Sequence, residues 1–130
     1  MTYKTEQENL WAGDFGLDYI NRNNSEIILN SKIAVFARML KSANNVHSIR
    51  ELGCNIGLNL VALKRLNPSL ELSGYEINLE AAHQASKKNV ADIKVGSILD
   101  EISDEKVDLT FAAGVLIHIN PNYLDSVYSN

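Results

Sequence analysis

The sequence has one cysteine, two prolines and no run of lysine or arginine. A single cysteine excludes an internal disulfide framework, and a net charge of −4 without a basic cluster gives no electrostatic footprint for nucleic acid or anionic lipid. No apolar run approaches the roughly 18 residues of a membrane span, and the polar start MTYKTEQENL has no signal core. These absences predict a cytoplasmic chain without nucleic-acid or membrane partners.

The composition that is present is ordinary for one folded domain. The chain has 130 residues, of which 45% are hydrophobic and 22% charged. Residues 1–45 are predicted to form a helical N-terminal extension, because Thr5 and Glu8 make a capping-box pattern before a short helix that runs to Ala12. A second helix is expected from Ile28 through Lys41, where the apolar residues recur at helical spacing before SANN ends the pattern.

Residues 46–130 alternate between strand and helix patterns. Apolar runs of strand length lie at 47–52, 70–76, 92–96 and 107–113, and helical stretches lie at 58–66 and 79–89. This alternation predicts an α/β fold with a Rossmann-like parallel sheet and helices on both faces. Open sheets of this kind bind ligands at the carboxyl ends of their strands, where the segment ELGCNIG is placed.

The segment ELGCNIG has the composition of a ligand-binding turn. Gly53 and Gly57 leave room for close approach of a ligand, and Asn55 tolerates a left-handed backbone. The dinucleotide fingerprint G-x-G-x-x-G matches only at Gly53, which disfavours a nicotinamide oxidoreductase. Glu76 follows at close to the roughly 20-residue spacing of a carboxylate that binds ribose hydroxyls, so an adenosine ligand is predicted.

At these residues the chain resembles class I S-adenosylmethionine-dependent methyltransferases. ELGCNIG resembles their motif I, with Asn55 in place of the middle glycine, and GYEIN, VGSILD and VDLTFAAGVLIHINP resemble their later motifs, in order over residues 48–124. The start TEQENLWAGDFGLDYINRN resembles methyltransferases associated with pseudaminic acid biosynthesis. The resemblance implies methyl transfer from S-adenosylmethionine to a small-molecule acceptor, a sugar or nucleotide-sugar of bacterial surface-glycan synthesis.

The resemblance also implies where the cofactor binds. Glu51 would bind the methionine amino group, Glu76 would accept from the ribose hydroxyls, and Ser97 stands where many relatives have an aspartate that binds the adenine amino group. The sulfonium end would lie at Ala113 and Gly114. The full expected set comprises Glu51, Gly53, Cys54, Asn55, Gly57, Glu76, Ile77, Ser97, Ile98, Ala113 and Gly114.

His118 is the candidate catalytic base, because it follows the fourth strand and its ordinary pKa suits proton transfer at neutral pH. Packing against the sheet or capping the next helix is the simpler explanation of this residue. No spacing of His, Cys and carboxylates predicts a metal site. NPNY at 120–123 resembles a motif that holds a flipped base in DNA methyltransferases, but Asn120 as a helix cap before Pro121 explains it better.

Two further alternatives stay open. Trp11, Phe15 and Tyr19 form either a packing stripe or part of a lid that hinges at AGDFG. The sequence stops at Asn130, before three further strands of the fold that it resembles, so an incomplete sheet that favours self-association is expected. The hypotheses for function are therefore a methyltransferase and, as the alternative, a non-catalytic module that binds an adenosine ligand.

Overall fold

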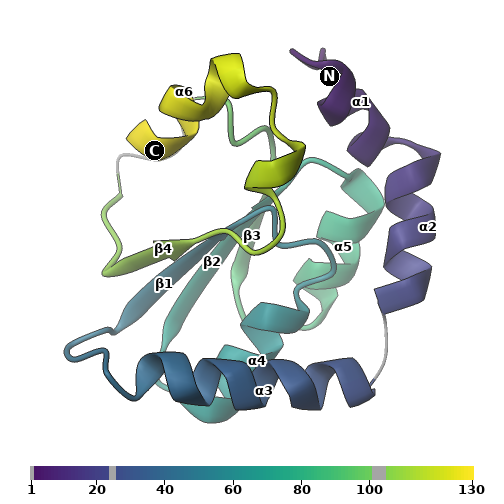
Figure 1. Cartoon of the computed structure of the whole chain (residues 1–130). Coiled ribbons are helices and arrows are strands. Elements are labelled where there is room, and N and C mark those ends of the chain that lie inside the picture. Colours follow the sequence, from purple (N-terminus) through teal and green to yellow (C-terminus); the bar gives the residue numbers. More distant parts are fainter. Residues whose placement is uncertain (1, 24–25, 101–104) are drawn as a thin grey trace.

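The sheet has four parallel strands, whose carboxyl ends meet at one edge. The computed structural model describes residues 2–23, 26–100 and 105–130. The strands are β1 (Ser48–Leu52), β2 (Glu71–Glu76), β3 (Asp92–Val95) and β4 (Leu109–Phe111). Their order, β3-β2-β1-β4, confirms the predicted α/β sheet (Figure 1). From β1 the chain adds β2 and then β3 on one side, and it returns past β1 to add β4 on the other side. The carboxyl ends of β1 and β4 are therefore the expected position for a ligand.

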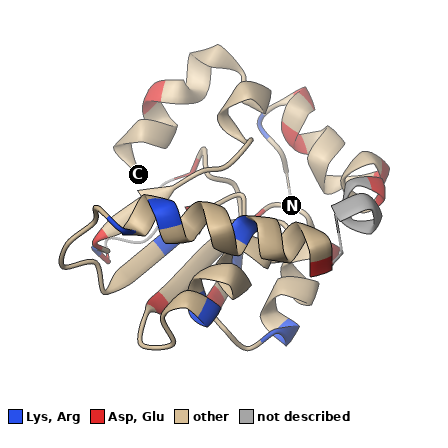
Figure 2. Cartoon of the chain, turned by 60° about the horizontal axis from the view of Figure 1, so that its bottom comes forward, with Lys and Arg blue, Asp and Glu red and all other residues tan. Residues whose placement is uncertain are grey.

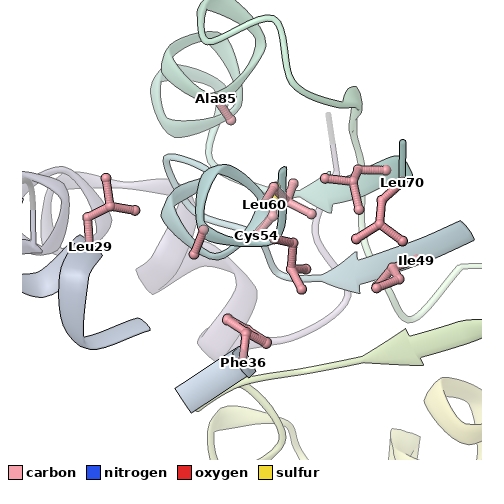
Figure 3. Close-up of a cluster of buried hydrophobic side chains, with 10 residues drawn as sticks. Leu29, Phe36, Ile49, Cys54, Leu60, Leu70 and Ala85 are labelled. Atoms are coloured by element: carbon pink, nitrogen blue, oxygen red, sulfur yellow. The ribbon is translucent and has the colours of Figure 1, made fainter. Parts of the chain in front are cut away.

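One face of the sheet is covered by α3 (Glu26–Leu40), α4 (Leu58–Leu66) and α5 (Leu79–Lys87). Their apolar side chains pack with those of β1 and β2 to form the main core (Figure 3). Ile49 and Leu60 are completely buried there, and the Phe36 ring lies edge-on to Phe111 of β4 at a centroid distance of 5.4 Å. The two predicted crossover helices, α4 and α5, therefore both contribute to the main core.

The opposite face is covered by the C-terminal segment. Leu52 and Tyr75 point to this face and pack with Val127 of α6 (Leu124–Ser129). Two short 3₁₀ helices, η1 (Leu116–His118) and η2 (Pro121–Tyr123), precede α6. Asn120 Oδ1 accepts a hydrogen bond from Asn122 N at 3.0 Å, so the predicted capping role of NPNY is confirmed.

The N-terminal extension forms α1 (Glu6–Ala12) and α2 (Asp14–Asn23) beside α5 (Figure 1). Thr5 Oγ1 accepts from Glu8 N at 3.1 Å, as the capping box predicts, but the Glu8 carboxylate accepts from Lys4 N instead of Thr5 N. The Trp11 and Phe15 rings meet edge-on at 5.1 Å. The Tyr19 side chain, also predicted in this stripe, lies outside the described residues.

Two elements are shorter than the sequence predicts. The fourth strand, predicted over 107–113, has only three residues, because Asp108 turns its carboxylate onto the amides of His47 and Ser48 and Gly114 leaves the sheet at a φ of +69°. The helix predicted to reach residue 89 ends at Lys87, because Asn89 adopts a φ of +53° that no helix accommodates.

Gly57 offers a test of how the glycine turn stabilises this fold. Its φ is +84°, and a Cβ there would lie 3.1 Å from Ala85 Cβ of α5. Gly57→Ala is expected to lower the free energy of unfolding by about 1–2 kcal/mol or more, measured by urea denaturation. Gly96→Ala is the control, since a Cβ there meets no described atom within 4 Å, and equal stability of the two variants would contradict the expectation.

Candidate functional site

The turn after β1 is shaped by three left-handed residues. Gly53, Asn55 and Gly57 have φ values of +76°, +51° and +84°, which a chain of ordinary residues would avoid. Tyr75 O accepts from the amides of Gly53 and Cys54 at 2.8 and 3.0 Å, so the end of β2 fixes the start of the turn. The predicted left-handed conformation of Asn55 is therefore present.

At both Gly53 and Gly57, an added Cβ would point toward other protein atoms. A Cβ on Gly53 would lie 2.7 Å from Val115 Cγ2, and a Cβ on Gly57 would approach Ala85 as described above. Gly57 also lies outside the residues that line the cavity at this edge of the sheet. The expectation that Gly57 makes room for a ligand is therefore corrected: it allows α4 to begin close against α5.

A cavity lies over the carboxyl ends of the strands and is closed on one side by the N-terminal helices. Of the predicted site residues, counting His118, ten line this cavity: Glu51, Gly53, Cys54, Asn55, Glu76, Ile77, Ile98, Ala113, Gly114 and His118. Gly57 and Ser97 do not. Trp11, expected in a packing stripe or a lid, also lines it. Further lining residues that the sequence patterns do not place there include Gln7, Glu8, Lys32, Asn59 and Asn78. Of these, Glu8 was recognised only as a capping residue.

Glu51 is the most deeply buried ionisable group of the cavity, with 1% of its surface exposed. Its Oε1 accepts from Asn59 Nδ2 at 2.6 Å, whereas Oε2 has no hydrogen-bond partner among the described residues. Burial raises the pKa of Glu51 to about 8, although the Asn59 hydrogen bond and the charge of Lys32 act in the opposite direction. The site therefore has a buried acceptor oxygen without a donor.

In Glu76, by contrast, both carboxylate oxygens accept hydrogen bonds within the protein. Oε1 accepts from Asn55 N at 2.8 Å and Oε2 accepts from Asn78 N at 2.7 Å. Burial raises the pKa of Glu76, and these amide hydrogen bonds lower it. A carboxylate has about four acceptor positions, so Glu76 can still accept from a ligand hydroxyl.

Helix α1 forms the roof of the cavity and is attached at both ends. Near β3, Ser97 Oγ donates to Glu8 Oε1, and Lys4 pairs with Asp100 at 2.6 Å. Near β4, the Trp11 ring lies 4.9 Å from the His118 ring. Trp11 therefore serves both the predicted packing stripe and the cover of the cavity.

Charged groups are unevenly distributed around this site. Figure 2 shows acidic positions on α1 and α2 and basic positions along α3. From α3, Lys32 reaches the lining of the cavity and favours the ionised form of Glu51. The cavity thus offers one cation and one unpaired carboxylate oxygen in the same region, which suits a zwitterionic amino acid group.

Other reactive groups have limited chemistry. Cys54 is buried in the core, and burial raises the pKa of its thiol, so it is no nucleophile. His47 and His83 are exposed, away from the cavity lining. Within the described ranges, no group of three or more His, Cys, Asp and Glu residues could bind a metal ion. Over the same ranges, none of the helices has both the length and the apolar character to span a bilayer.

The fold is similar to that of several solved methyltransferases. The plantazolicin methyltransferase BpumL, in complex with a desmethylPZN analog and SAH, matches with 23% identity and a TM-score of 0.69 over 94% of this chain and 51% of its own. Magnesium protoporphyrin IX methyltransferase from Synechocystis PCC 6803 with bound SAM matches with 14% identity and a TM-score of 0.70 over 99% of this chain and 72% of its own.

A third similar structure is the glycopeptide N-methyltransferase MtfA complexed with sinefungin, with 10% identity and a TM-score of 0.66 over 75% of this chain and 43% of its own. No protein-family model and no curated protein sequence matches the chain. The chain spans about half the length of BpumL. At these identities the similarities show the fold, which is the Rossmann-like fold of class I methyltransferases.

The raised pKa of Glu51 predicts a pH dependence of stability. Between pH 4.5 and about 8 the folded state keeps a proton on Glu51 that the unfolded state has lost, so stability falls as pH rises, by up to about 1.4 kcal/mol per unit. Glu51→Gln is expected to lack this fall in urea denaturation at pH 6, 7 and 8. The exposed Glu71→Gln is the control and should keep it. Parallel curves for the wild type and Glu51→Gln would contradict the assignment.

Proposed function

We propose that this chain contains the cofactor site of an S-adenosylmethionine-dependent methyltransferase. The observation that carries the proposal is Glu51 Oε2, a buried acceptor to which no described residue donates, beside the cation of Lys32. An α-amino acid group has one ammonium and one carboxylate, which would pair with Glu51 and Lys32 respectively. A cofactor that ends in methionine therefore fits this part of the cavity.

The rest of the cavity suits an adenosine. Glu76, which keeps free acceptor capacity, would bind the ribose hydroxyls, and Ile77 and Ile98 would pack on the base. A nicotinamide dinucleotide fits less well, because it brings no ammonium group to Glu51 Oε2. The absence of two of the three fingerprint glycines also disfavours a nicotinamide dinucleotide.

When bound, S-adenosylmethionine supplies a methyl group that its positive sulfur has already activated. The residues of the chain then have to orient this group and receive the acceptor. Ala113 and Gly114 line the β4 end of the cavity with minimal bulk. His118, exposed beside Trp11 in the same region, would accept a proton where the acceptor has to lose one.

The acceptor is proposed to be a small molecule. A sugar or nucleotide-sugar of pseudaminic acid synthesis is supported only by the resemblance of the N-terminal sequence, in the segment that forms α1 and α2. The same segment lies over the cavity, so we assign it the role of a cover for the cofactor. A non-catalytic module that binds an adenosine ligand would keep the same contacts and lack methyl transfer.

Calorimetric titration with S-adenosylhomocysteine and, separately, with NAD tests the cofactor assignment. Binding of the first and not of the second is expected. Because a ligand ammonium beside Glu51 favours its ionised form, binding at pH 7 should release close to one proton more in the wild type than in Glu51→Gln. Proton release follows from the observed enthalpy in buffers of different ionisation enthalpy. Tighter binding of NAD, or equal proton release in the two proteins, would overturn the assignment.

A further inference from the structure

Glu8 is a buried carboxylate of the cavity that the proposed cofactor contacts do not use. It lies on α1, with 6% of its surface exposed, and it belongs to the residues that line the cavity. Its Oε1 accepts from Ser97 Oγ, and its Oε2 accepts from Lys4 N at 2.7 Å. A helix cap would need only the second of these contacts, and it would not require burial.

The position of Glu8 along the cavity is set by Ser97. This residue lies between Gly96 and Ile98, which both line the cavity after β3. Glu51 lies near the carboxyl end of β1 and His118 follows β4, so in the sheet order they belong to the other end. Glu8 therefore faces the part of the cavity where the apolar Ile77 and Ile98 would hold the base.

Ser97 and Lys4, the polar residues that hold Glu8 and α1 in place, have their donors engaged within the protein. The Ser97 hydroxyl gives its proton to Glu8 and already accepts from Leu99 N at 3.0 Å. The ammonium of Lys4 is paired with Asp100. With two contacts made, the Glu8 carboxylate keeps acceptor positions for a further donor. Such a site selects a ligand that presents an N–H group between apolar surfaces.

We propose that Glu8 accepts a hydrogen bond from the exocyclic amino group of the adenine base. This inference rests on the proposed cofactor. The residue that recognises the base would then belong to α1, the same helix that covers the cavity. The base then strengthens the attachment of α1, and a base without the amino group leaves Glu8 without that donor.

The test compares two ligands by calorimetry: S-adenosylhomocysteine and its analogue in which hydrogen replaces the adenine amino group. The wild type is expected to prefer the first by about tenfold or more, the effect of one hydrogen bond to a charged group. Glu8→Met should reduce this preference to about twofold or less. Glu8→Gln, which keeps an acceptor and the shape of the side chain, should give an intermediate preference.

Lys4→Met is the matched control, because it breaks the ion pair that joins Asp100 to the residues just before α1, and it leaves the Glu8 carboxylate in place. It should weaken both ligands by the same factor and preserve the preference. If the Glu8 variants behave like Lys4→Met, Glu8 only anchors α1 and the proposal is overturned. Equal affinity of the wild type for both ligands overturns it as well, with the cofactor assignment intact. No binding of S-adenosylhomocysteine would remove the cofactor assignment and this proposal together.

Discussion

The carboxylate of Glu76 connects three parts of the site that no backbone ladder joins. One oxygen accepts from Asn55 N, which fixes the left-handed turn after β1, and the other accepts from Asn78 N at the start of α5. Asn78 in turn caps α5 through Ala81 N and donates to Trp11 O of the roof helix at 3.0 Å. The geometry of turn, helix and roof therefore depends on one buried group at the end of β2.

The two buried acids, Glu51 and Glu76, differ in the way the cost of burial is compensated. Glu76 has an amide donor for each oxygen, so much of the cost of burial is offset inside the protein. Glu51 has only Asn59, and its pKa of about 8 expresses the remaining cost. A group of this kind is stabilised when a ligand brings the missing donor.

Local patterns allowed much of the fold and part of the site to be predicted. Alternating strand and helix patterns predict the parallel sheet, and the spacing of Gly53 and Glu76 predicts which strand ends line the cavity. The bond between Ser97 and Glu8 joins residues 89 positions apart, and no local pattern encodes it. Gly57 was misassigned for a related reason, since its constraint comes from packing against another helix.

Burial changes along the cavity in the direction that the proposed methyl transfer would need. Glu76 and Ile98 are buried where the adenosine would lie, whereas Ala113, Gly114 and His118 are exposed beyond β4. A buried end gives hydrogen bonds their full strength because water does not compete there. An exposed end lets an acceptor reach the reacting group. One sheet edge can therefore hold the cofactor by one end and present the other, with α1 covering the part between them.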